Sequence, residues 1–290
     1  MRVMKPTVFD LYHPGVALAY FAAVLVFCMA AFQPAYLGLA LVSGFAYSAY
    51  LRGWRAAARS ATWQLPLLLI VAVANPLFSA SGSTELFRIG LRAVYLESLA
   101  FGLCMGVMLM SVVLWFSNAS HVLSTDKVMA LFGNVAPVVA VMLSFAARLV
   151  PQYVRRGAEI EAVQQATSAA RPRSAKEKGA FRLRQVSVLM GWSMEDSLET
   201  ADAMRARGWG AAPRRTAYRR FRFHARDAAA LAVLALLAGA NAFLAWTACG
   251  QFSFYPTMSR LALWWGYAPY VALVFLPLVL QIVEDVRWRA

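Results

Sequence analysis

The stretch VYLESLAFGLCMGVMLMSVVLWFS, residues 94–117, decides the class of fold. Its one charged residue is Glu97, near the beginning of the run. A helix of about 20 apolar residues crosses the hydrocarbon core of a bilayer, so this stretch is long enough to span a membrane. Further apolar runs lie along the chain at residues 15–32, 34–51, 63–79, 128–150, 228–249 and 261–283. The pattern predicts an all-α fold, that of a polytopic helical membrane protein.

The composition supports the same class. Of 290 residues, 61% are hydrophobic and only 14% are charged, whereas a soluble domain has about 25% charged residues. The first apolar run continues almost directly into the second, without the cleavage site of a signal peptide, so we expect it to remain in the protein. The three cysteines lie singly in apolar segments, without a CxxC pair, and the three histidines are scattered. The sequence therefore predicts neither a disulfide framework nor a metal site.

The net charge of +14 is concentrated in one segment. Residues 151–226 hold sixteen of the 28 Lys and Arg but seven of the 14 acidic residues, a net +9. Because Lys and Arg accumulate on the cytoplasmic side of membrane proteins, we expect this segment in the cytosol. The basic link LRGWRAAARS, residues 51–60, and the N-terminus with Arg2 and Lys5 are expected on the same side. The segment lacks interleaved stacking aromatics, and its charge has this topological explanation, so nucleic acid is disfavoured as a partner.

These charges determine the predicted organisation. If the run 128–150 crossed the membrane, the basic segment after it would emerge on the opposite side, against the charge bias. We therefore predict an interfacial or re-entrant helix at 128–150, in which Gly133 and Pro137 permit a bend. The full division is N-terminal transmembrane helices at 1–127, this helix, cytosolic coupling helices at 151–226, and a C-terminal transmembrane hairpin at 227–290. The chain is predicted to cross a membrane several times, with its N-terminus and the helices of residues 151–226 on the cytosolic side.

The basic segment is predicted to form two helices joined by a linker. Pro151 suits the first turn of the first helix, the linker is SAARPRSAKEKG, residues 168–179, and the second helix extends from about Arg182 to Arg207. Apolar residues recur in the second helix at spacings of three and four, at Leu183, Val186, Met190, Met194, Leu198 and Ala201. We call these residues the apolar stripe. It packs either on the helix at 128–150 or on a partner protein.

The second helix ends in SLETADAMRARGWG, residues 197–210. Gly208 stands where a glycine in the left-handed conformation ends a helix. Arg207 and Arg205 lie in the last turn, where cations complement the helix dipole. The guanidinium of Arg207 offers a fork of donors suited to a carboxylate on another molecule. A solvated arginine at a helix end is the alternative.

Several stretches in order along the chain resemble one family. SLETADAMRARGWG is followed by RRTAYRRFRFHARD, and upstream stand NPLF (75–78), STDKVMALFG (124–133) and LSFAARLVP (143–151). Together they resemble the transmembrane T component of energy-coupling-factor (ECF) transporters, the cobalt-transport Q-type family. The resemblance implies a scaffold that joins two ABC ATPase subunits to a small membrane-embedded substrate-binding S component, for uptake of a vitamin or a transition-metal ion.

The resemblance also implies which residues dock the ATPases. In this family two Ala-Arg-Gly motifs on the coupling helices bind the two ATPases. The second motif matches Ala206, Arg207 and Gly208, with the arginine pairing to an ATPase carboxylate. The first has no clean counterpart; Arg171, one turn beyond the expected place, is the candidate, and the alternatives are that Arg155 or Arg156 makes the contact or that the contact is lost. The chain has no P-loop motif, so it is expected to be a non-catalytic subunit without a cofactor, surrounded by membrane lipids.

Two other functions remain open. His121 and Asp126 have the H-x4-D spacing of some membrane acyltransferases. A self-sufficient secondary transporter or channel is the second alternative, although such proteins usually carry ionisable residues within their spans. The polar candidates within the spans are Asn75 and Asn241, for which helix-packing hydrogen bonds are the simpler interpretation. A GxxxG pair in the run 94–117, Gly102 and Gly106, packs either on the S component or within the chain.

Overall fold

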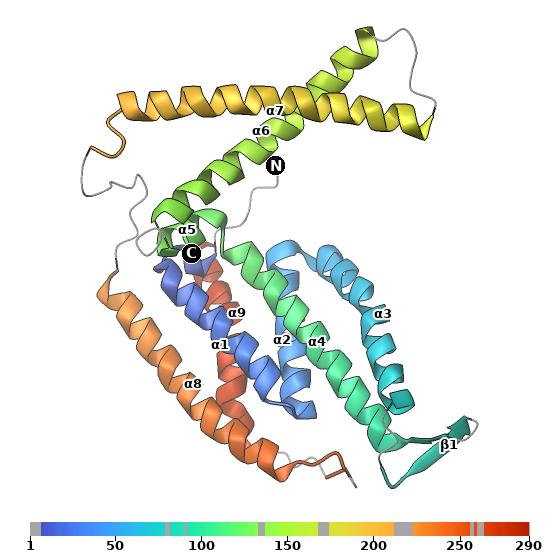
Figure 1. Ribbon diagram of the computed structural model, residues 1–290. Coiled ribbons are helices and arrows are strands. Elements are labelled where there is room, and N and C mark those ends of the chain that lie inside the picture. The colour runs from blue at the N-terminus through green and yellow to red at the C-terminus, as the bar shows by residue number, and fades with distance from the viewer. Residues whose placement is uncertain are drawn as a thin grey trace. The chain divides into compact units, whose positions relative to one another are not determined.

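The computed structural model describes residues 7–78, 82–89, 92–132, 137–167, 174–211, 223–255, 258–259 and 264–289. These residues are almost entirely helical, as the sequence predicts (Figure 1). The chain separates into two compact units. The first, which we call the membrane unit, comprises Met1–Val128 and Phe221–Ala290, and the second, the coupling unit, comprises Met129–Arg220.

The membrane unit is a bundle of long helices. Its helices are α1 (Pro14–Ala30), α2 (Pro34–Arg52), α3 (Trp54–Phe78), α4 (Leu96–Val122), α8 (Ala225–Gln251) and α9 (Ala268–Arg289). Short 3₁₀ turns precede α1 (Val8–Asp10) and α9 (Trp265–Tyr267), and α5 (Thr125–Phe132) leads out of the unit. An antiparallel hairpin of β1 (Glu85–Ile89) and β2 (Arg92–Tyr95) connects α3 to α4. This hairpin is not predicted by the pattern of apolar runs in the sequence.

Five of the described helices are long and apolar enough to cross a membrane: α3, α4, α6, α8 and α9. They make the chain a multi-pass membrane protein. Helix α1 is equally apolar in character but shorter. Helix α6 qualifies with the lowest mean hydropathy of the five, 1.2, so the interfacial position expected for residues 128–150 stays a prediction.

The core of the membrane unit is centred on Trp115 of α4, which is fully buried. Its indole Nε1 donates a hydrogen bond to the Ala40 carbonyl of α2 at 3.0 Å. One turn further along, Asn118 Nδ2 donates to the Gly44 carbonyl, also at 3.0 Å. A Cβ at Gly44 would lie 3.0 Å from Trp115 Nε1, so only glycine leaves room for the ring. These buried polar contacts fix α4 against α2 in one register.

The GxxxG pair of α4 packs within the chain. A Cβ at Gly102 would lie 2.8 Å from the Ala72 carbonyl oxygen of α3, and one at Gly106 would lie 2.9 Å from the Leu68 carbonyl oxygen. The two glycines therefore allow the α3 and α4 backbones to approach closely. Of the two interpretations of this motif, the geometry favours internal packing.

The polar residues within the spans also form packing hydrogen bonds. Asn75 Nδ2 donates to the Ser98 carbonyl of α4 at 2.8 Å. Asn241 Nδ2 donates to the Leu237 carbonyl at 2.8 Å and to the Pro269 carbonyl of α9 at 3.1 Å. Each asparagine thus links two helices of the bundle, as the simpler interpretation of the sequence expected.

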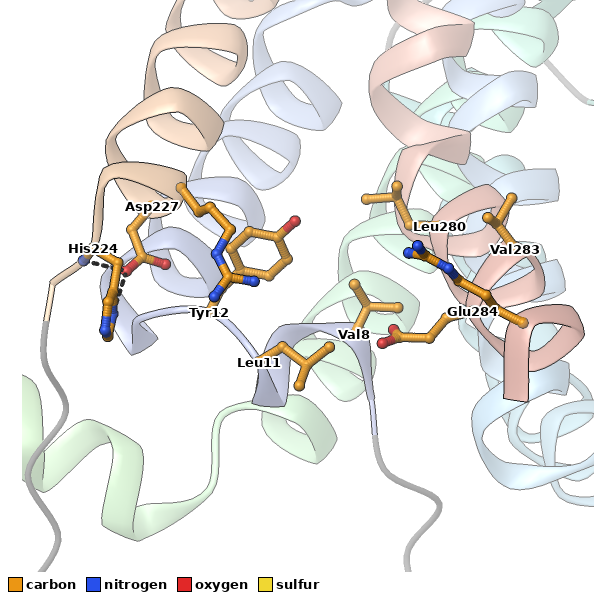
Figure 2. Close-up of a pocket in the computed structure, with 10 residues that line it drawn as sticks. Val8, Leu11, Tyr12, His224, Asp227, Leu280, Val283 and Glu284 are labelled. Atoms are coloured by element: carbon orange, nitrogen blue, oxygen red, sulfur yellow. Dashed lines mark hydrogen bonds and ion pairs between the residues drawn. The ribbon is translucent and has the colours of Figure 1, made fainter. Parts of the chain in front are cut away.

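The start of α8 is fixed to the start of α1 by a buried carboxylate. Asp227 accepts hydrogen bonds from the backbone N–H of His224 at 2.8 Å and from that of His13 at 2.9 Å. Figure 2 shows Asp227 and His224 together at this helix end. Because both carboxylate oxygens are engaged by backbone donors, Asp227 has a structural role as a cap.

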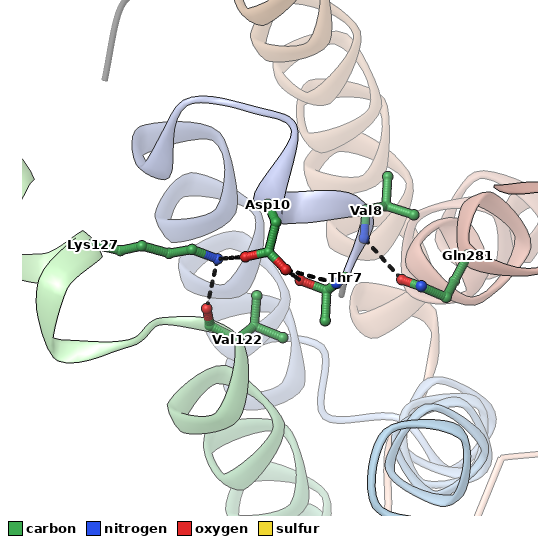
Figure 3. A network of polar contacts seen from close by, with 6 residues as sticks. All are labelled: Thr7, Val8, Asp10, Val122, Lys127 and Gln281. Carbon is green, nitrogen blue, oxygen red and sulfur yellow. Dashed lines mark hydrogen bonds and ion pairs between the residues drawn. The ribbon is translucent and has the colours of Figure 1, made fainter. Parts of the chain in front are cut away.

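A second network ties the N-terminal turn to α5 (Figure 3). Lys127 Nζ lies 2.6 Å from Asp10 Oδ1 and donates to the Val122 carbonyl at 2.9 Å. Asp10 Oδ2 accepts from the backbone N–H of Thr7 at 2.7 Å and from its hydroxyl at 3.0 Å. Partial burial acts to raise the pKa of Asp10, but the hydrogen bonds from Lys127 and Thr7 outweigh it, so the pKa is lowered. Lys127 of the STDK stretch therefore has a structural role, in which it links the N-terminal turn to the end of α4.

The coupling unit contains two long helices, α6 (Pro137–Thr167) and α7 (Ala175–Ala206). The prediction that a helix begins at Pro151 is wrong, because α6 continues through this residue. Helix α7 begins earlier than the predicted Arg182, at a capping box in which Ser174 Oγ accepts from the backbone N–H of Lys176 and Glu177 accepts from the Ser174 N–H. The S-x-x-E signal for this start stood in the stretch assigned to the linker.

Candidate functional site

The C-terminus of α7 ends in a Schellman motif, which determines how Arg207 is displayed. The Gly208 N–H donates to the Arg205 carbonyl at 2.9 Å, and the Trp209 N–H donates to the Met204 carbonyl at 3.0 Å. Gly208 has φ +76°, the left-handed conformation that the sequence predicted. Arg207 is the C-cap residue, and its side chain is exposed.

A cleft of about 750 Å³ opens between α6 and the C-terminal half of α7. Its charged lining residues are Arg148 and Arg156 of α6 and Asp196, Glu199 and Arg207 of α7. Three positive and two negative side chains leave the cleft with a net charge of +1. The site therefore favours an anionic group such as a carboxylate.

Two polar contacts hold α6 and α7 together at this cleft. Arg156 forms an ion pair with Asp196, and Gln185 Nε2 donates a hydrogen bond to the Gly157 carbonyl. A Cβ at Gly157 would lie 3.7 Å from Leu189, so the helices touch closely here as well. The ion pair is partly buried, which makes it a stronger link than an exposed pair.

The remaining charges of the cleft are available to a partner. Within the part of the chain that the structure describes, the side chains of Arg148, Glu199 and Arg207 make no hydrogen bond or ion pair. Arg205 lies at the same helix end, and its Nη1 is 3.9 Å from Asp202 Oδ1, one turn back along α7. Arg207 is thus the unengaged cation at the end of α7, as the docking interpretation requires.

Ala206 and Gly208 flank Arg207 with little bulk. A Cβ at Gly208 would meet nothing within 4 Å, so the position is open and glycine is required there by the backbone conformation alone. Ala206 is exposed at the last residue of α7. A partner surface can therefore approach Arg207 closely from this end.

The apolar stripe of α7 does not pack on α6. Its five large side chains are exposed within this unit, from 52% for Val186 to 73% for Leu183, and Ala201 is exposed where it lines the cleft. Helix α6 instead contacts the other face of α7, the face that carries Gln185 and Asp196. The interpretation that the stripe packs on the neighbouring helix is therefore wrong, because two polar contacts orient α7 the other way.

The first docking position is less defined. Arg171 lies outside the described residues. Of the two alternatives, Arg156 is engaged by Asp196, whereas Arg155 is exposed. Arg171 and Arg155 remain the candidates for this contact.

The residues of the acyltransferase alternative do not form a catalytic pair. Among the described residues, His121 at the end of α4 and Asp126 at the start of α5 share no hydrogen bond or ion pair. The described residues also contain no group of three or more His, Cys, Asp or Glu side chains that could hold a metal ion.

Comparison of the chain with models of known protein families finds no match, and no curated protein matches it either. The membrane helices, the cleft of the coupling unit and the end of α7 are therefore the features that bear on function.

Proposed function

We propose that this chain is the transmembrane scaffold of an ECF-type ABC importer, in which partner ATPases supply the energy and a membrane-embedded S component binds the substrate. The observation that carries the proposal is Arg207, which has no side-chain partner among the described residues and lies at a Schellman-capped helix end beside a cleft of net positive charge. Such an arginine is suited to a bidentate contact with an ATPase carboxylate. The four apolar helices of the membrane unit, α3, α4, α8 and α9, supply the membrane anchor.

The coupling unit has the mechanical properties that this role needs. Helix α7 has 32 residues and is therefore about 48 Å long at 1.5 Å per residue. The Arg156–Asp196 pair and the Gln185–Gly157 hydrogen bond couple α7 to α6. A displacement of Arg207, produced when ATP closes the two ATPases, would move the two helices together, because packed helices shift as units.

The apolar stripe supports a second contact of the scaffold. Large apolar side chains exposed in one row along a helix mark an interaction surface. We propose that the stripe contacts the S component, so that the α7 helix transmits motion from the ATPases to the substrate-binding subunit. The expected substrate is a vitamin or a transition-metal ion such as cobalt or nickel, and the S component selects it.

The proposal also requires the coupling unit in the cytosol of a bacterium, at the inner membrane. The net charge of +9 over residues 151–226 supports this side. With the coupling unit outside the cytosol, Arg207 would reach no ATPase.

Co-purification of the assembled complex tests the proposal. The chain is expressed with the ATPases and S component of its own organism. Arg207→Glu should lower the retained ATPase at least about tenfold, because a carboxylate would face a carboxylate. Arg205→Glu at the same helix end is the control and should retain far more ATPase than Arg207→Glu does.

The two proposed contacts can be separated in the same assay. Met190→Glu in the apolar stripe should release the S component while the ATPases stay bound, and Arg184→Glu, exposed on α7 outside the stripe, should release neither. Uptake of a solute by vesicles containing this chain alone would instead favour the self-sufficient transporter.

A further inference from the structure

Two adjoining cavities lie at one end of the membrane unit, between the start of α8, the end of α9 and the N-terminal turn. Their volumes are about 610 and 410 Å³. They share Val8, Tyr12, Arg226 and Leu280 as lining residues, so they form one continuous groove. Figure 2 shows the polar end of the groove, with His224 and the α8 start on one side and the α9 residues on the other.

The polar end of the groove carries unengaged charge. The cap role of Asp227 accounts for both of its oxygens. Among the described residues, Arg226, Arg287 and Glu284 make no hydrogen bond or ion pair with their side chains. The charged groups of the groove without a partner among the described residues are thus two guanidinium groups and one carboxylate, while the carboxylate of Asp227 is held by the backbone N–H groups of His13 and His224.

The other end of the groove is apolar and follows α8 into the bundle. It is lined by Val16 of α1, by Ala229, Ala230 and Val233 of α8, and by Leu276 of α9. The two alanines leave space that a larger side chain would fill.

The depth of the groove matches one leaflet of a bilayer. From Arg226 to Leu234, α8 rises about 12 Å, which is close to half of the roughly 30 Å hydrocarbon thickness. Both α8 and α9 are membrane-span candidates whose ends meet here, so the charged end lies at the membrane surface and the apolar end below it.

We propose that this groove binds an anionic phospholipid of the phosphatidylglycerol type. Arg226 and Arg287 bind the phosphodiester, Glu284 accepts a hydrogen bond from a headgroup hydroxyl, and one acyl chain lies over Ala229 and Ala230. Basic pockets between transmembrane helices are suited to anionic headgroups. A water-soluble phosphate would use the charged end alone and leave the apolar groove empty, so the joined cavities favour a lipid.

Native mass spectrometry of the purified full chain in detergent tests the polar end. Phosphatidylglycerol and phosphatidylcholine with the same acyl chains are offered in competition. The wild type should retain phosphatidylglycerol about tenfold more than phosphatidylcholine, which is the gain in affinity typical of a charge-assisted contact. The double variant Arg226→Gln, Arg287→Gln should reduce this preference to about twofold or less. Arg59→Gln, an exposed arginine of α3 outside the groove, should keep it.

A second pair of variants tests the apolar end. Ala230→Phe fills the groove and should lower lipid retention about tenfold, whereas Ala232→Phe, exposed on the same helix outside the groove, should not. Equal retention of the two lipids by the wild type would overturn the proposal. So would undiminished retention by Ala230→Phe, or displacement of the lipid by glycerol phosphate at equal concentration, since either result would mean that the acyl chain lies elsewhere.

Discussion

Replacing Gly102 by alanine should destabilise the membrane unit, although alanine is the better helix former. The added Cβ would lie 2.8 Å from the Ala72 carbonyl oxygen and 2.8 Å from Asn75 Cβ, both in α3. Neither neighbour is the end of a flexible side chain, so α3 must move away from α4. Overpacking of this kind costs about 1–3 kcal/mol, which exceeds the gain of about 0.5–1 kcal/mol from the helix propensity of alanine.

The matched control is Gly239→Ala in α8, where an added Cβ would meet nothing within 4 Å. The Gly239→Ala variant gains the helix propensity of alanine without a steric clash. Its unfolding midpoint should therefore rise or stay unchanged, while the unfolding midpoint of Gly102→Ala falls. Unfolding of the two variants and the wild type is followed in one detergent by intrinsic tryptophan fluorescence, since Trp115 lies in the core of the same unit. Equal shifts for the two variants would refute the close packing of α3 on α4.

Three further changes have expected outcomes. Gly208→Ala should cost about 1–2 kcal/mol because φ is +76° there, so amide hydrogen exchange in the last turn of α7 should become faster, whereas Gly191→Ala in the same helix should not accelerate it. The lowered pKa of Asp10 means that its contribution to stability is complete above its unfolded pKa of about 4 and is lost as pH falls through the lower folded pKa. Acid should therefore reduce the unfolding midpoint of the wild type more than that of Asp10→Asn. In a variant without the native cysteines, Ser187→Cys on α7 should react with a membrane-impermeant maleimide only after the cells are permeabilised; labelling of intact cells would remove the cytosolic location and the docking role together.

The membrane helices were predictable because their signal is local. The apolar run at 94–117 corresponds closely to α4 at Leu96–Val122, because a helix that crosses the hydrocarbon core needs about 20 consecutive apolar residues. The hairpin of β1 and β2 was not predicted, because strand pairing depends on the partner strand more than on the residues of either strand. The register of the hairpin places Arg88 opposite Ala93. Neither strand alone specifies this register, because it depends on how the two strands pair.

The end of α7 was predictable for a related reason. A glycine that follows a run of helix formers and arginines predicts where the helix ends, and Gly208 has the positive φ expected of such a glycine. The orientation of α7 was not predictable from its apolar pattern. The most apolar face is exposed, and the face held against α6 is fixed by Arg156–Asp196 and Gln185–Gly157, contacts between residues 28 to 40 positions apart.

The sequence pattern does not predict the cleft beside Arg207, because Pro151 suits the first turn of a helix and so divides α6 into two segments. Proline removes one backbone hydrogen bond and is costly in the interior of a soluble helix. Helix α6 nevertheless continues through Pro151, so residues on both sides of it share one face. The cleft-lining residues of α6 recur at spacings of three and four across the proline, at Phe145, Arg148, Leu149, Gln152, Tyr153 and Arg156. That periodicity is the signal that could have found the site. The same continuity gives α6 a part in the proposed function, because one helix carries both the apolar residues that make it a membrane-span candidate and the arginines that line the cleft.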